Sequence, residues 1–263
     1  MKSLHISVAP EVVSHIGSLK ITNSLITSLI VMVFLLILAI KVKTANTQSK
    51  KSGLYLAVEL IIEKFYMFFK NIAGERIEVI FPLLMTFFLF IILGNWIGLF
   101  PGVGSIGFYE AGEHGEVFVP FFRGPNADLN TTFALALISV SVTQYLSIKT
   151  LGFKTYISKF INIKNPIKFF VGLLELISEF AKILSFSFRL FGNIFAGEVL
   201  ISVMIFLIPI LVPVPFLILE VFVGFIQALV FTMLTTIFIV IATEGSHGTE
   251  ATGPEGLRSG GGV

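Results

Sequence analysis

Long apolar runs constrain this chain more strongly than any other feature of its sequence. Each run approaches or exceeds the roughly 20 residues that a helix needs to cross a bilayer. The runs cover residues 24–40, 81–100, 131–148, 166–207 and 216–243. Hydrophobic residues make up 55% of the chain, which is above the usual share in soluble domains. The sequence therefore predicts an all-α polytopic membrane protein with five membrane helices.

The segments around these runs are more polar and divide the chain. Residues 54–70 mix apolar residues with four charges, which predicts one amphipathic helix lying at the membrane interface. An N-terminal outer segment, residues 1–23, precedes a single membrane domain, residues 24–243. We expect the polar, Gly-rich tail, residues 244–263, to be disordered. Lysines follow the first run without a small-residue cleavage site, so this run is expected to stay as a membrane anchor.

The last two runs are expected to form a hairpin. Residues 166–207 contain no proline after the first position and would span about 60 Å as one helix. Because the hydrocarbon core is only about 30 Å thick, such a helix has to tilt steeply or bend. Pro209, Pro213 and Pro215 predict the turn into the last helix. The sequence therefore predicts a long, strongly tilted hairpin.

The loops differ in charge, and this difference predicts the topology. Residues 41–51 and 149–168 are rich in lysine and are expected to face the cytoplasm. Residues 101–130 form a long loop that carries glycines and acids, and it is expected to face outward. The N-terminus is then outside and the C-terminus cytoplasmic.

Residue types exclude several kinds of chemistry. The chain has no cysteine, which excludes disulfides and thiolate sites, and its four histidines all lie outside the apolar runs. It also lacks a GxxxxGK[ST] phosphate-binding loop, so we expect no direct ATP binding. We expect no cofactor, no metal and no nucleic acid partner.

Arg189 stands in the middle of the fourth apolar run. A guanidinium stays charged at working pH, and placing it at bilayer depth costs roughly 2.5–3.5 kcal/mol on insertion scales. Such a charge is normally retained because it meets water, an acid or a moving ion. Arg189 therefore makes the chain a candidate for ion translocation.

Arg189 belongs to a polar stripe at helical spacing. Its members are Glu175, Ser178, Lys182, Ser185, Arg189 and Asn193. Gly192 and Ala196 lie on the same side, where small residues let another helix approach closely. The stripe can serve a moving partner, or it can pack against the protein's own helices.

Acids lie on both sides of Arg189. In an antiparallel hairpin Gln227 falls at nearly the depth of Arg189, and Glu220 falls near Glu198 toward the outer end. Two carboxyls close together in a low dielectric suit a proton relay, although two exposed interfacial acids are the alternative. Toward the cytoplasmic loop lie Glu175 and Glu179.

Glu179 is spaced for an ion pair with Lys182, which is as consistent with a structural role as with a functional one. With acids on both sides, the layout suggests two aqueous half-channels that Arg189 keeps apart. A mobile partner has to carry the ion past this cation.

These residues closely resemble subunit a of the F-type ATP synthase membrane sector. The segment from Ser187 to Glu198 is similar to that family's signature, and Gly124 to Thr132 resembles the stretch that opens its third span. Gln227 falls where the family has its last-helix glutamine. The resemblance covers roughly residues 10–245.

The resemblance implies a role for each candidate residue. Arg189 would be the stator arginine facing a rotor ring of c subunits, with Asn193 and Gln227 as polar neighbours. Glu198 and Glu220 would line the outer half-channel. The resemblance also implies that Glu175 and Ser178 line the inner exit. Some family members carry His where this chain has Glu220.

The resemblance also implies partners and a location. The partners would be the c-ring, the peripheral-stalk b subunits and the lipid bilayer of the bacterial plasma (inner) membrane. The translocated ion would be the proton, with Na⁺ as the alternative, because the rotor site largely decides the ion. The subunit would be non-catalytic within a proton-transporting ATP synthase.

Two other readings compete with this one. A secondary transporter is expected to show paired repeats and broken mid-membrane helices, and the sequence shows neither. A structural scaffold in a membrane complex accounts for the hydrophobicity but not for the arrangement of Arg189 and the acids.

Overall fold

The computed structural model describes residues 8–17, 19–46, 53–100, 102–112, 115–160, 166–208 and 211–244. The expected disordered tail lies outside these residues, apart from Glu244. Pro209 of the predicted turn also lies outside them.

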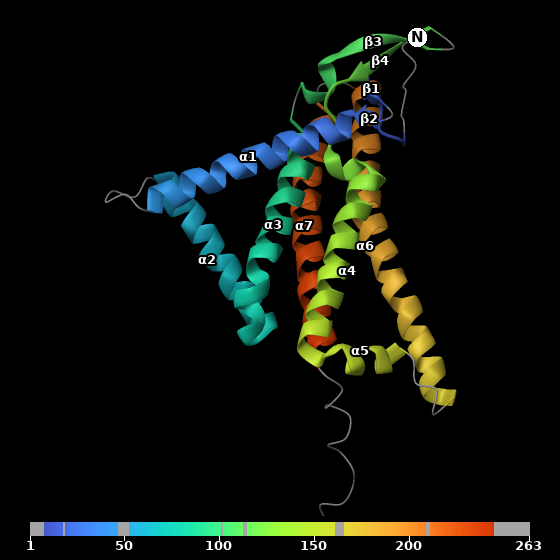
Figure 1. The fold of residues 1–263 in the computed structure, drawn as a ribbon. Coiled ribbons are helices and arrows are strands. Elements are labelled where there is room, and N and C mark those ends of the chain that lie inside the picture. Colours follow the sequence, from blue (N-terminus) through green and yellow to red (C-terminus); the bar gives the residue numbers. More distant parts are fainter. Residues whose placement is uncertain are drawn as a thin grey trace, which may run out of the picture.

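Seven α-helices make up most of the described chain (Figure 1). Their bounds are α1 (Asn23–Asn46), α2 (Gly53–Ala73), α3 (Ile77–Ile97), α4 (Leu129–Leu151), α5 (Phe153–Phe160), α6 (Pro166–Leu207) and α7 (Pro213–Thr243). Helices α3, α4, α6 and α7 form a bundle in which α7 packs against the other three and α4 also packs against α6. Helix α1 runs away from the bundle. Helix α2 then runs back from the C-terminal end of α1 to the N-terminal end of α3.

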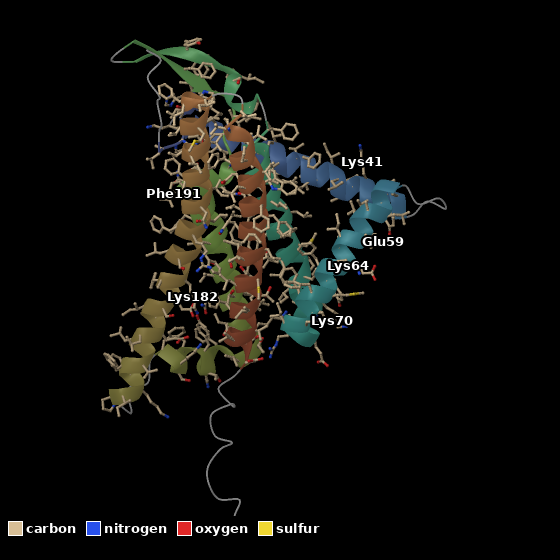
Figure 2. All side chains as sticks on the ribbon, turned by 180° about the vertical axis from the view of Figure 1, so that it is seen from behind. Lys41, Glu59, Lys64, Lys70, Lys182 and Phe191 are labelled. Atoms are coloured by element: carbon tan, nitrogen blue, oxygen red, sulfur yellow. The ribbon has the colours of Figure 1, made fainter. Side chains whose placement is uncertain are left out.

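Within the residues that the structure describes, five helical stretches are long and apolar enough to cross a membrane, which confirms the predicted fold class. One of these stretches, Tyr55–Ile97, includes both α2 and α3. Figure 2 shows Lys41, Glu59, Lys64 and Lys70 on the arm formed by α1 and α2. The interfacial position of α2 and the tilt of the α6–α7 hairpin stay predictions.

Phenylalanine rings connect three helices in the bundle core. Phe186 of α6 lies 5.1 Å from Phe231 of α7, measured between ring centroids, and Phe231 lies 5.5 Å from Phe87 of α3. All three side chains are buried. Aromatic pairs at this spacing add stabilisation beyond the burial of their area. This core sets the relative register of α3, α6 and α7.

Short strands flank the helices at one end of the bundle. They are β1 (Val12–Ile16) paired with β2 (Leu19–Thr22), and β3 (Gly107–Gly112) paired with β4 (Gly115–Pro120). The 3-10 turns are η1 (Gly74–Arg76), η2 (Val103–Ser105) and η3 (Pro125–Ala127). The segment expected to be a loop, residues 101–130, therefore contains a hairpin. Antiparallel pairing satisfies its backbone groups despite the many glycines.

Turn η3 anchors this end to the bundle through buried polar contacts. Asn126 donates to the Asn95 side-chain oxygen at 2.7 Å, and Asn95 donates to the Gly224 carbonyl at 2.8 Å. Asp128 caps α4 by accepting from the Asn130 backbone N–H at 2.9 Å, and Ser24 of α1 donates to Asp128 at 2.6 Å. These contacts fix the chain next to the half of α6 and α7 that lies at the strand end of the bundle.

Candidate functional site

Arg189 lies on the exposed side of α6, near the middle of this 42-residue helix. It donates to Ser185 Oγ, one turn earlier, at 3.3 Å. No carboxylate of the described residues forms an ion pair with it. An unpaired cation on an apolar helix therefore faces outward from the bundle.

The surface around Arg189 has room for another helix. Asn193 is exposed one turn further along, and Ala196 is exposed as well. A Cβ atom added to Gly192 would meet nothing within 4 Å. The stripe is therefore not packed against the protein's own helices at these positions, which argues against the internal-packing alternative.

Gln227 of α7 lies at the same level as Arg189. The two side chains line one small cavity together with Phe186, Leu190 and Phe231. The antiparallel hairpin thus brings Gln227 to the depth that its spacing predicts.

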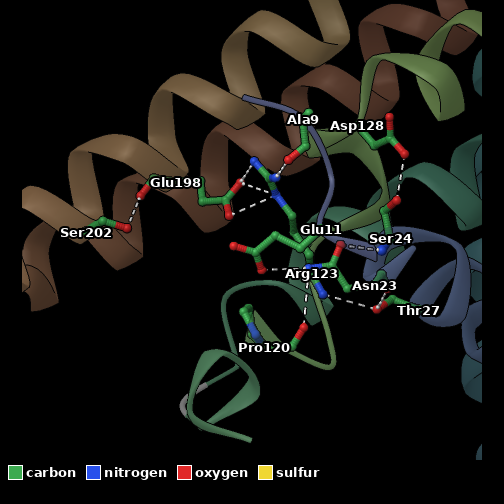
Figure 3. Close-up of polar contacts among 10 residues, drawn as sticks. All are labelled: Ala9, Glu11, Asn23, Ser24, Thr27, Pro120, Arg123, Asp128, Glu198 and Ser202. Atoms are coloured by element: carbon green, nitrogen blue, oxygen red, sulfur yellow. Dashed lines mark hydrogen bonds and ion pairs between the residues drawn. The ribbon is translucent and has the colours of Figure 1, made fainter. Parts of the chain in front are cut away.

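Glu198 lies further toward the strand end of α6, where it meets Arg123. Arg123 Nε lies 3.2 Å from Glu198 Oε1, and Nε and Nη2 each donate to Oε2 at 3.3 Å (Figure 3). Arg123 precedes η3, and the sequence analysis did not single it out.

Glu220 of α7 is buried, with 7% of its surface exposed. Its carboxyl group packs against Gly197, the residue before Glu198 on α6. Its Oε1 atom has no hydrogen-bond partner among the described residues. Glu220 therefore packs against the residue that precedes Glu198, while the Glu198 carboxylate itself contacts Arg123.

Glu175 and Glu179 lie toward α5, a short helix that was not predicted from the sequence. Glu175 forms an ion pair with Lys159 of α5 at 2.9 Å, and Ser178 is exposed. Glu179 pairs with Lys182 at 2.7 Å, as the spacing of these two residues predicts. Figure 2 shows Lys182 nearer the α5 end of α6 than Phe191.

Glu179 also connects α6 to α4 and α5. Gln144 donates to Glu179 at 2.5 Å, and Tyr156 donates to Gln144 at 2.9 Å. Burial, and then the charge of Glu179, raise the pKa of the Tyr156 phenol above its usual range. All three residues border a mostly apolar cavity of about 530 Å³ between α4, α5 and α6.

Arg123, Gln144 and Tyr156 contact candidate residues or their partners, and these contacts were not predicted from the sequence. Only Arg123 had a sequence signal, because it directly precedes the family-like segment from Gly124 to Thr132. Within the described residues, no group of three or more His, Cys, Asp or Glu side chains could hold a metal ion.

Comparison with known proteins gives a consistent result. Residues 24–240 match the family model described as "ATP synthase A chain". The chain is 32% identical to ATP synthase subunit a of Moorella thermoacetica over 234 residues, covering 88% of this chain and 95% of the relative. It is also 32% identical to that of Syntrophobacter fumaroxidans over 248 residues, 93% of each chain. The Legionella pneumophila subunit a is 31% identical over 224 residues, 85% of this chain and 87% of the relative.

Proposed function

This chain belongs to the ATP synthase A chain family, and from that premise we propose that it is the stator ion-channel subunit of an ATP synthase membrane sector. It provides two offset half-channels that pass protons to and from a rotating c-ring. It thereby couples the proton-motive force to ATP synthesis without catalysing that synthesis itself. The observation that carries this proposal is that Arg189 on α6 is exposed and forms no ion pair with any carboxylate of the described residues.

Arg189 separates the two half-channels. A permanent cation repels a proton that would otherwise cross directly from one channel to the other. It also attracts an ionised carboxylate on a passing c subunit and so favours release of that subunit's proton. Asn193 and Gln227 surround this contact, and the open space at Gly192 lets the ring approach.

Protons enter from the outer side past Glu198 and Glu220. Glu220 packs against Gly197, the residue before Glu198 on α6, so both acids lie at one end of the hairpin. A proton passed on from there neutralises a ring carboxylate, and a neutral site can turn through lipid at far lower cost than a charged one.

Protons leave past Glu175 and Ser178 toward the basic loop and α5. Each elementary charge that crosses releases about 2.3 kcal/mol per 100 mV of membrane potential. In this proposal the N-terminus is outside, the C-terminus is cytoplasmic, and the partners are the c-ring and the peripheral-stalk b subunits. The proton is the proposed ion, with Na⁺ as the alternative.

The experiment that tests this proposal replaces Arg189 in the whole complex. Inverted membrane vesicles carrying Arg189→Ala are compared with the unchanged chain for ATP-driven proton pumping. We expect pumping to disappear while the complex still assembles and a passive proton leak persists or grows.

The matched control is Arg76→Ala, which removes an arginine that contacts Thr243 and Glu244 at the far end of the bundle. This variant is expected to keep pumping. If Arg189→Ala also keeps pumping, the stator role is wrong, and a transporter or a scaffold becomes the better explanation.

A further inference from the structure

Arg123 is a buried cation outside every apolar run. Its side chain is 7% exposed, although it lies in the link between β4 and η3. A buried guanidinium is costly unless it is paired and hydrogen-bonded. Its pairing with Glu198 satisfies part of this requirement with contacts from both Nε and Nη2.

We propose that Arg123 is a positioning residue for Glu198, which fixes the place of the carboxylate at the outer end of α6. This inference rests on the proposed function, in which Glu198 lines the outer half-channel. Arg123 does not carry the proton itself, because its guanidinium stays protonated.

Arg123 is held from several directions. Its Nη1 donates to the Ala9 carbonyl at 3.0 Å, and its backbone N–H donates to Thr27 Oγ1 of α1 at 3.3 Å. The guanidinium carbon lies 5.8 Å from the ring centroid of Phe195, one turn before Glu198 on α6. Figure 3 shows the hydrogen bonds of Arg123 to Ala9 of the N-terminal segment, Thr27 of α1 and Glu198 of α6. The guanidinium therefore has little freedom to turn.

The two members of the pair differ in exposure. The Glu198 side chain is 40% exposed, against 7% for Arg123. Arg123 thus contacts the carboxylate from the protein side and leaves its other side accessible. This is the arrangement needed for a group that is fixed in place and still reachable by an incoming proton.

The contacts require an arginine rather than any cation. The planar guanidinium contacts Glu198 with two nitrogens while a third donates to Ala9. A lysine carries the same charge on one compact ammonium and does not reproduce this fork. Arg123→Lys therefore changes the geometry of the contact while it preserves the net charge.

The test measures ATP synthesis by the purified whole complex in liposomes as the outer-side proton concentration is varied. With Arg123→Lys we expect half-maximal synthesis to need an outer proton concentration about tenfold higher, as for a misplaced reactive group. The maximal rate at saturating driving force and the amount of assembled complex are expected to stay unchanged.

Two further variants make the result decisive. Arg76→Lys changes another arginine that contacts a carbonyl and a glutamate, and it should leave the half-maximal concentration unchanged. Glu198→Gln should lower synthesis strongly. If Glu198→Gln has no effect, it is the proposed role of Glu198 that fails. If Glu198→Gln lowers synthesis and Arg123→Lys changes nothing, or lowers only the maximal rate or the assembly, the positioning role of Arg123 is wrong.

Discussion

The carboxyl group of Glu220 on α7 packs directly against Gly197 on α6, in the space that a Cβ atom would occupy. Glycine at this position lets the two helices of the hairpin approach closely. Because Gly197 precedes Glu198, the contact places both acids at one level of the hairpin. The two acids are nevertheless held differently, since Glu198 contacts Arg123 and Glu220 is buried.

Gly197→Ala is expected to impair proton transport by displacing Glu220. The added methyl group overlaps both carboxyl oxygens, so the side chain or α7 has to move. We expect ATP-driven pumping per assembled complex to fall about tenfold, as for a misplaced reactive group. Adding Glu220→Asp shortens the acid by one methylene and should restore part of the activity. Unchanged pumping in Gly197→Ala would show that the position of Glu220 is not critical.

Asn95→Leu is expected to destabilise the bundle rather than to act on transport directly. Asn95 is 3% exposed, donates to the Gly224 carbonyl and accepts from Asn126. Its loss removes two buried hydrogen bonds, each of which contributes about 0.5–1.5 kcal/mol. The thermal midpoint for release of the subunit from the purified complex measures this effect.

Trp96→Phe provides the comparison for Asn95→Leu. It removes an exposed hydrogen bond from Trp96 to the Val221 carbonyl while it keeps an aromatic ring at this position. We expect its thermal midpoint to fall much less. If the thermal midpoint falls equally in both variants, the buried hydrogen bonds of Asn95 contribute little to stability.

Substitutions of Glu175 and of Glu179 should have opposite effects on proton transport and on stability. Glu175 and Lys159 are 33% and 41% exposed, so their ion pair contributes at most about 1 kcal/mol to stability. Glu175→Gln is therefore expected to slow proton release while the thermal midpoint stays nearly constant.

Glu179→Gln is expected to show the opposite behaviour. Glu179 is 14% exposed and accepts from both Lys182 and Gln144, so losing its charge costs about 1.5–3 kcal/mol. The thermal midpoint should drop, with pumping per assembled complex less affected than in Glu175→Gln. If Glu179→Gln stops pumping without loss of stability, then Glu179 and not Glu175 is the inner acid.

The shared depth of Arg189 and Gln227 could be predicted because it follows from the length and periodicity of the two helices. Two long apolar helices separated by prolines have to run antiparallel, and counting from the turn matches their depths. The ion pair of Glu179 with Lys182 was predictable for the same local reason, since three residues bring them to one face of the helix.

The pairing of Arg123 with Glu198 could not be predicted in this way, because 75 residues separate the two. Helix periodicity shows which residues share a face and a depth, but it does not show which distant segment packs against them. Gln144 likewise donates to Glu179, which lies 35 residues away in the sequence, because α4 packs against α6. The amino-acid sequence by itself determined the membrane class, the long hairpin and the level of Arg189, since these depend on local pattern and length. Only the tertiary structure decided which acid is buried and which is held by a cation, because docking of the β4–η3 link and of α7 against α6 sets these long-range contacts.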